Sequence, residues 1–509
     1  MSRTNRFLGG LSLGFSHQFI VLLVGLWLTP LFISRLGQHD YGVWLIITQI
    51  TAYLGLLDLG VVGLLPRETA FAVGRGGIKS PELPTLVAQT AGIVLKQWPI
   101  VVLSAAVAWF LARNIWQLAE LPLAIIILTF VIVFPCRLFS AILQGLQDLA
   151  FLGRSQIVAW TTGTATAVIL VLSGYGLTAL AASWAVNQFI SSALCFFRLK
   201  SKFPTIFPAR LRRLDRVATV DYLKKGIWIS TSQIAQILTA GTDMLVIGKL
   251  LGPAATVPYS CTGKLAGVLA NKPQMVMQAA FPALSELRTG GSRLRIRQAT
   301  TALGQAMLVA SGAVGCVVLA VNRGFVGWWA GPNQYAGSLL TLMTVVAMLV
   351  RHWNTTFTYS LFCFGHERRL AVTGVADGCV SLLTSAVLVW LVGPVGAPIG
   401  MLTGICLVNM PANLVALARE MATSPWSLLG SSLNWVGRFG VAAMAAVAFG
   451  ALWKPHGLVA ISTQALLSGA LYLILVIPVL LREPLGSYLR PRLQSLAALS
   501  QRIFPVTAN

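Results

Sequence analysis

The chain has 509 residues, of which 56% are hydrophobic and only 10% are charged. In soluble proteins roughly a quarter of all residues are charged. This composition therefore excludes an ordinary soluble enzyme and indicates an integral membrane protein. The net charge of +23 raises the alternative of nucleic-acid binding. The positions of the basic residues decide against that alternative, as described below.

Long apolar runs favour membrane-spanning helices over a β-barrel. Runs of about 20 residues, bounded by charged residues or by Gly and Pro, predict fourteen spans. The first follows a short basic start, and we expect a membrane helix there rather than a cleaved signal. The predicted ranges are 10–34, 41–65, 84–112, 120–147, 155–173, 177–198, 225–248, 256–285, 299–321, 335–364, 370–391, 395–418, 434–453 and 458–481.

The Lys and Arg residues support this count. With both termini in the cytoplasm, 27 of the 37 fall in cytoplasmic segments, counted with the ends of the spans, and five fall on the opposite side. Cytoplasmic loops of membrane proteins carry this excess of positive charge, and an odd number of spans would remove it. The basic composition therefore reflects topology and predicts no nucleic-acid partner.

The non-cytoplasmic loops, such as "SGYG" and "VGPVGAP", are too short for a catalytic domain. No HExxH or Walker motif is present, so we expect a transporter without a cofactor rather than an enzyme. The seven cysteines stand singly inside apolar runs, which predicts neither disulfides nor a zinc site.

Two parts of the chain share short matches in the same order. A shift of 215 residues aligns "SRLG" (34–37) with "KLLG" (249–252), and Ser140 recurs as Ser360 at a similar offset. We therefore predict an all-α fold with two six-helix lobes in the same orientation, related by a pseudo-two-fold axis along the membrane normal. Transporters built from such repeats hold substrate between their halves and work by alternating access.

The predicted division of the chain follows from this repeat. The long basic segment between the lobes is either a solvated linker or an amphipathic helix on anionic headgroups. The predicted parts are a first lobe (1–198), a cytoplasmic linker (199–224), a second lobe (225–418), an additional helix pair (419–481) and a cytoplasmic tail (482–509).

The segment "TGKLAGVLANKPQMVMQ" (262–278) carries two lysines inside a predicted span. A charge at bilayer depth costs about 2.5–3.5 kcal/mol on insertion scales. Lys264 and Lys272 are eight residues apart, about 800° of helix, so they lie within about 80° of each other. Asn271 falls on the same polar face, which therefore extends through much of the span.

Arg137 and Arg351 occupy two other spans at comparable depth. Buried cations on several spans predict a positive central cavity for an anion, most naturally a phosphate, because Arg offers a planar fork and Lys a point charge. The alternative is that the cations snorkel to the membrane surface or pair with the buried acids Asp58, Asp243 and Asp377.

The same three acids are candidates for coupling transport to an ion gradient. A carboxylate removed from water exchanges protons at a higher pH than usual. The alternative is a structural hydrogen bond or salt bridge between helices.

The segment "TDMLVIGKLLGPAATVPYSCTGKLAGVLANKPQMVMQAAFPALSEL" resembles the span 7–8 signature of the polysaccharide-transporter (O-antigen flippase-like) branch of the MOP exporter superfamily. "RLGQHDYGVWLIITQITAYLGLLDLGVVG" is similar to its span 1–2 counterpart, and "AILQGLQDLAFLGR" to the end of its span 4. The resemblance covers nearly the whole chain.

This resemblance implies a flippase that moves polyprenyl-diphosphate-linked oligosaccharide, such as an O-antigen or exopolysaccharide repeat unit, across a bacterial inner membrane. The diphosphate would meet the candidate cations, and the lipid tail would stay outside. Membrane lipids, a glycan polymerase and chain-length machinery are the implied partners. The alternatives are a multidrug exporter of the same superfamily, a membrane glycan polymerase or ligase, and a peptidoglycan-precursor flippase.

Overall fold

The computed structural model describes residues 20–21, 23–78, 80–116, 120–208, 216–289, 293–453, 455 and 457–490. Within these ranges the chain is almost entirely helical and contains no strand, as predicted. A short apolar helix, Leu23–Leu36, comes first. The elements that follow are α2 (Gln38–Leu54), η1 (Gly55–Asp58), α3 (Val61–Gly76), α4 (Glu82–Trp116), α5 (Glu120–Val133), η2 (Phe134–Cys136), α6 (Arg137–Gly145), α7 (Leu149–Leu172), α8 (Leu177–Lys202), η3 (Pro204–Ile206), α9 (Arg216–Ala240), α10 (Asp243–Leu250), α11 (Pro253–Thr289), α12 (Arg293–Trp329), η4 (Pro332–Gln334), α13 (Ser338–Cys363), α14 (Glu367–Val392), η5 (Gly393–Val395), α15 (Gly396–Gly404), the π-helix η6 (Ile405–Asn409), α16 (Met410–Glu420), α17 (Pro425–Leu452) and α18 (Gly457–Leu480).

Nine segments of the described chain are long and apolar enough to cross a membrane. One of them, Glu367–Glu420, covers two consecutive predicted spans. The ranges 225–248, 256–285 and 335–364 coincide with helices but are not among the nine, because polar side chains lower their hydropathy. The predicted span 10–34 begins outside the described residues. A multi-pass membrane protein is thus confirmed, while the count of fourteen and the two-lobe symmetry stay predictions.

The chain forms two compact units, Met1–Val257 and Pro258–Asn509, and the boundary falls inside α11. Helices α9 and α10 belong to the first unit because they pack on its helices. Tyr222 of α9, for example, donates a hydrogen bond of 3.2 Å to the carbonyl oxygen of Val61 on α3. The predicted lobes, 1–198 and 225–418, were derived from the repeated order of membrane spans and not from packing. Their bounds stay a prediction.

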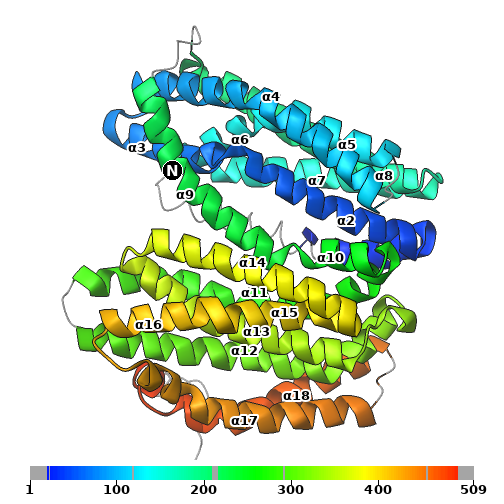
Figure 1. Ribbon diagram of the computed structural model, residues 1–509, viewed down its shortest axis with the longest axis vertical. Coiled ribbons are helices and arrows are strands. Elements are labelled where there is room, and N and C mark those ends of the chain that lie inside the picture. Colours follow the sequence, from blue (N-terminus) through cyan, green and yellow to red (C-terminus); the bar gives the residue numbers. More distant parts are fainter. Residues whose placement is uncertain are drawn as a thin grey trace, which may run out of the picture. The chain divides into compact units, whose positions relative to one another are not determined.

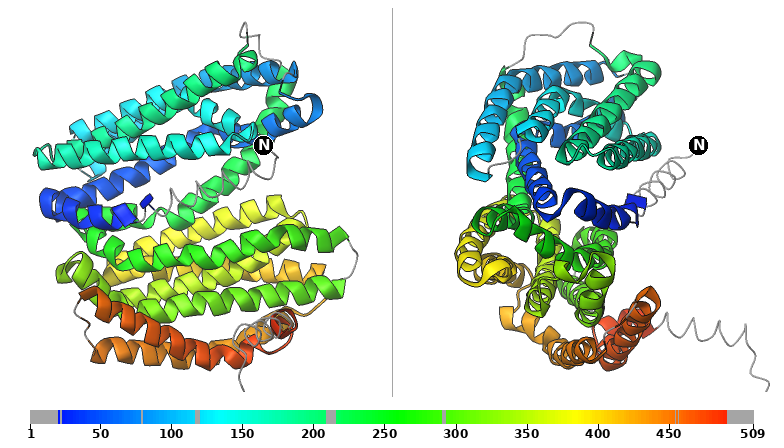
Figure 2. Two further views of the ribbon diagram at one scale, coloured as in Figure 1. Left: turned by 180° about the vertical axis from the view of Figure 1, so that it is seen from behind. Right: turned by 90° about the vertical axis from the view of Figure 1, so that its right-hand side faces the viewer.

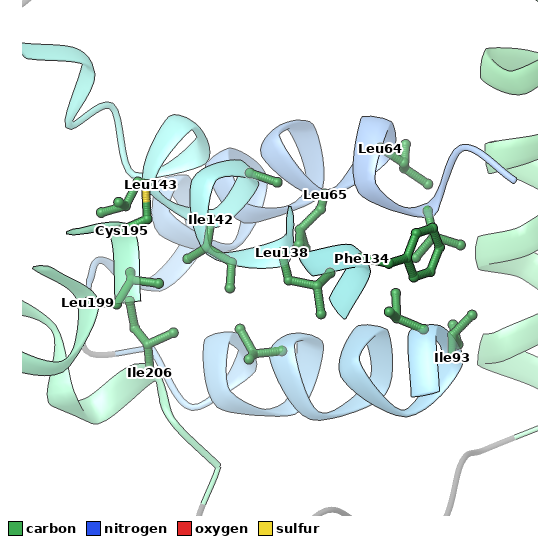
Figure 3. Packing of buried hydrophobic residues seen from close by; sticks show 14 of the residues in the cluster. Leu64, Leu65, Ile93, Phe134, Leu138, Ile142, Leu143, Cys195, Leu199 and Ile206 are labelled. Atoms are coloured by element: carbon green, nitrogen blue, oxygen red, sulfur yellow. The ribbon is translucent and has the colours of Figure 1, made fainter. Parts of the chain in front are cut away.

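The core of the first unit lies among α3, α4, α6, α8 and α9 (Figure 1). Figure 3 shows Leu65 of α3, Ile93 of α4 and Leu138 of α6 in this interior. Among lipid tails such helices gain little from the hydrophobic effect, so close packing stabilises them instead. Gly145 illustrates this, since an added Cβ would stand 2.5 Å from the Cβ of Thr69. The glycine lets α6 approach α3.

In the second unit, α17 and α18 pack on α12 along one side of the unit (Figures 1 and 2). A buried polar contact holds this pair. The indole N–H of Trp435 donates to the Tyr472 hydroxyl at 2.9 Å, and that hydroxyl donates to the carbonyl oxygen of Val309 at 2.9 Å. Gly312 provides the space, because an added Cβ would stand 2.4 Å from the Tyr472 oxygen. Together with the Ser468 hydroxyl, which donates to the carbonyl oxygen of Cys316 at 3.1 Å, the Tyr472 hydroxyl anchors the predicted additional helix pair to α12.

Replacing that hydroxyl should loosen the anchor. We expect Tyr472→Phe to lower the free energy of unfolding by about 1–3 kcal/mol, because it leaves the buried indole N–H of Trp435 without its acceptor. Thermal unfolding of the purified protein in detergent measures the effect. Tyr488→Phe, at a tyrosine that is 53% exposed, is the matched control and should change little. Equal melting temperatures for the two variants would contradict the anchor.

Candidate functional site

The two lysines predicted to hold an anion lie on α11, which continues through Pro273 without a break. Lys264 is half-buried, and Lys272 and its neighbour Asn271 are exposed. Neither lysine forms a hydrogen bond or an ion pair with a residue that the structure describes. Within the described residues, the two lysines of α11 therefore have no counter-charge.

A third candidate cation, Arg137, is engaged by a carboxylate. Its Nη2 lies 3.4 Å from Asp58 Oδ2, and its Nη1 donates a hydrogen bond of 3.3 Å to the carbonyl oxygen of Gly55. The Asp58 side chain is only 2% exposed, whereas that of Arg137 is 34% exposed. The guanidinium is thus neutralised on one side and accessible on the other. Pairing with a buried acid, the alternative interpretation of the sequence, occurs at this position.

An interruption between α2 and α3 places this pair. The chain tightens into η1 and then turns through Leu59 and Gly60, whose φ angles are 48° and 72°. Asp58 Oδ1 accepts a hydrogen bond of 2.9 Å from the Gly60 N–H. This bond satisfies a backbone donor at the start of α3 that would otherwise lack a partner in the helix. Gly60 also permits close packing on α9, because an added Cβ would stand 2.2 Å from the carbonyl oxygen of Gly226.

Arg137 also lines a cavity of about 330 Å³ in the first unit. Its walls come from α2, from the α5–η2–α6 segment and from α8. The aromatic and polar side chains around it include Trp44, Thr48, Thr51, Phe130, Trp184 and Gln188. Phe134 lines the cavity and also belongs to the core of the unit, where Figure 3 shows it. The site therefore rests on a packed wall.

The second unit contains a buried polar network around Asp377, which is 2% exposed. Its Oδ1 accepts a hydrogen bond from the Ser381 hydroxyl at 3.1 Å, and its Oδ2 accepts one from Asn409 Nδ2 at 2.9 Å. Asn409 in turn accepts from Asn413 Nδ2 at 2.7 Å. Arg351 is close enough for its charge to act on the Asp377 carboxylate. Two sequence candidates therefore lie near each other in this unit.

Two local features create that network. Asn409 ends the π-helix η6, and such bulges are frequent at functional sites because they change the direction of side chains within a helix. Gly404 precedes the bulge, and an added Cβ there would stand 2.5 Å from Asp377 Oδ1. The glycine thus lets α15 approach the carboxylate.

The remaining candidate, Asp243, occupies the first turn of α10, where a carboxylate interacts favourably with the helix dipole. It acts electrostatically on Tyr53 of α2, whose hydroxyl hydrogen-bonds Thr242 Oγ1 at 2.6 Å. Asp243 therefore sits at the contact between α2 and α10. The binding and coupling roles of all the candidate residues remain predictions.

Several of these residues were not among the candidates that the sequence indicated. Trp184 and Gln188, and likewise Asn409 and Asn413, are spaced four apart and so share one face of a helix. Paired polar or indole groups at this spacing inside apolar runs are a signal that could have found them. The described residues include no group of three or more metal-ligating side chains. All seven cysteines are free thiols.

Comparison with known proteins identifies the fold. Residues 88–322 match a family profile described as "Polysaccharide biosynthesis protein". The lipid II flippase MurJ, in an inward closed conformation, superposes with a TM-score of 0.60 at 11% identity, covering 92% of this chain and 98% of MurJ. No protein of curated function matches the sequence.

Two further structures have the same fold. An inward-facing multidrug resistance MATE family transporter of the MOP superfamily gives a TM-score of 0.54 at 16% identity, covering 84% of this chain and 99% of its own. A MOP superfamily transporter from Pyrococcus furiosus is described as having a binding pocket of reverse polarity. It superposes with a TM-score of 0.51 at 14% identity, covering 82% of this chain and 95% of its own. The chain thus has the MOP transporter fold, and its resemblance to the polysaccharide transporters of this superfamily is confirmed.

A double-mutant cycle tests the Arg137–Asp58 pair. We expect Arg137→Ala and Asp58→Ala each to destabilise the protein, and the double variant to be more stable than the sum predicts by about 1–3 kcal/mol. Unfolding in SDS mixed micelles gives the four free energies. The exposed pair Arg75–Glu82, 3.1 Å apart, is the control and should couple by at most about 1 kcal/mol because solvent screens it. Strict additivity at Arg137 and Asp58 would disprove the pairing.

Proposed function

We propose that the protein is a flippase that moves a polyprenyl-diphosphate-linked oligosaccharide, an O-antigen or exopolysaccharide repeat unit, to the outer leaflet of a bacterial inner membrane. It works by alternating access, with fourteen spans and both termini in the cytoplasm. Its product passes to a glycan polymerase and chain-length machinery. The match to a polysaccharide biosynthesis family and the MOP transporter fold support this proposal.

The observation that carries the proposal is the pair of lysines on α11. Lys264 and Lys272 have no partner among the described residues, although an uncompensated charge inside a span costs a few kcal/mol. A diphosphate supplies several anionic oxygens and offsets this cost by charge-assisted hydrogen bonds. Asn271 and Arg351 are further candidates for its contacts. Arg137 contributes less charge, because Asp58 already neutralises it.

The same observations argue against a multidrug exporter of the superfamily. A pump for cationic drugs needs accessible carboxylates. Here Asp58 is engaged by Arg137, and both oxygens of Asp377 accept hydrogen bonds within the second unit. Two lysines without described partners favour an anionic cargo instead.

We further propose that Asp377 couples transport to an ion gradient. Its carboxylate is buried, is bonded to groups of α14 and the π-helix, and lies within reach of the charge of Arg351. A change in its protonation would alter these bonds and thereby the packing of α14 on η6. Asp58 and Asp243 fit coupling less well, since Asp58 is already neutralised by Arg137 and Asp243 is stabilised by the dipole at the start of α10.

The lysine assignment predicts a loss of glycan export. In cells that depend on this protein, we expect Lys264→Ala or Lys272→Ala to lower surface glycan several-fold. The double variant should lower it at least about tenfold, because both charges that offset the diphosphate are gone. Immunoblotting of the surface glycan, normalised to protein in the membrane, measures the effect. Lys249→Ala, at an exposed lysine near the end of α10, should export normally. Normal export by the double variant would rule the assignment out.

The coupling assignment predicts an uncoupled variant. In proteoliposomes with an imposed pH gradient or membrane potential, the wild type should translocate the lipid-linked glycan faster than without one. We expect Asp377→Asn to lose this stimulation, since the amide cannot exchange a proton. Asp148→Asn, at a part-buried acid paired with Arg198, is the control and should stay gradient-dependent. Full stimulation of the Asp377 variant would show that the carboxylate is only structural.

A further inference from the structure

We propose that the cavity of the first unit is a sugar subsite. It holds one pyranose ring of the glycan. This inference rests on the proposed function and adds the means by which the transporter distinguishes a glycan-bearing lipid from the bare lipid carrier.

The aromatic walls fit the face of a sugar ring. Trp44 of α2 and Trp184 of α8 line the cavity together with Phe130 and Phe134. A pyranose presents C–H groups on its faces, which pack against flat aromatic rings, and indoles offer the largest such surface. At about 330 Å³ the cavity lies at the lower end of small-molecule sites, which run from about 300 to 1,000 Å³. The volume suits a single ring rather than a whole repeat unit.

The hydrogen-bonding groups fit the edge of the ring. Gln188, one turn after Trp184 on α8, forms no hydrogen bond with a residue that the structure describes, and the same holds for the indole N–H groups of Trp44 and Trp184. Polar groups inside a membrane-spanning segment need partners, because no lipid tail can supply a hydrogen bond. Sugar hydroxyls are both donors and acceptors, so they can satisfy the amide and the indoles together.

The charge of the cavity favours a sugar over a diphosphate. Arg137 is the cation among the lining residues, and Asp58 lies 3.4 Å from it, so the pair is close to neutral. A guanidinium has five N–H donors, and here one nitrogen contacts the carboxylate and another the Gly55 carbonyl. The donors that remain can bind hydroxyls without requiring a charged ligand.

Binding to the purified, full-length protein tests the subsite. The probes are undecaprenyl diphosphate and the same lipid carrying N-acetylglucosamine, glucose or galactose, with affinities measured by native mass spectrometry or microscale thermophoresis. We expect at least one glycosylated lipid to bind about tenfold more tightly than the bare lipid. Trp184→Ala and Gln188→Ala should each remove most of that preference while leaving affinity for the bare lipid unchanged.

Controls separate this inference from the proposed function. Trp184→Phe keeps a ring and should retain part of the preference, and Trp390→Ala, at a tryptophan that is 73% exposed, should retain all of it. Lys264→Ala with Lys272→Ala should weaken all four lipids equally. Equal affinity of the wild type for bare and glycosylated lipids, or a preference that survives both cavity variants, would overturn the subsite alone. Failure of the wild type to bind any of these lipids would overturn the proposed function with it.

Discussion

A charge inside a bilayer must be paired, hydrogen-bonded or neutralised by a ligand, and the polar interior of this protein is arranged around that requirement. Arg137 forms an ion pair with Asp58, and Asp377 accepts hydrogen bonds from Ser381 and Asn409. Lys264 and Lys272 form neither kind of contact with the described residues. Among the described residues, these two lysines therefore differ from the paired polar groups, and composition alone could not have shown that difference.

Breaks in helical regularity bring these groups into place. The turn between α2 and α3 positions Asp58, and the π-helix at the end of α15 positions Asn409. Irregular backbone at membrane depth is tolerated where protein surrounds it or where it lines a cavity. At each break a buried carboxylate accepts a hydrogen bond, from the Gly60 N–H at the first and from Asn409 at the second.

Much of the helical organisation could be predicted from the sequence. Long apolar runs determine helices in a bilayer almost by themselves, so the predicted ranges within the described chain fall largely on helices. The ranges 41–65 and 225–248 each contain a break that the apolar pattern did not predict. The sequence left pairing of the cations with buried acids open as an alternative. It could not show that Arg137 pairs with Asp58, since this depends on the contact of α6 with the turn after α2. The role of Trp184 and Gln188 as cavity walls was equally hidden, because helical spacing shows that they share a face but not what the face contacts. Compact units also differ from the predicted lobes, since α9 and α10 pack on the first unit.

A structure of the protein in a lipid bilayer, with an undecaprenyl-diphosphate-linked sugar bound, tests the role of the unpaired lysines most directly. The proposed mechanism predicts diphosphate oxygens within about 4 Å of the Nζ atoms of Lys264 and Lys272. Lysine side chains directed at lipid tails, with the diphosphate bound elsewhere, would contradict it.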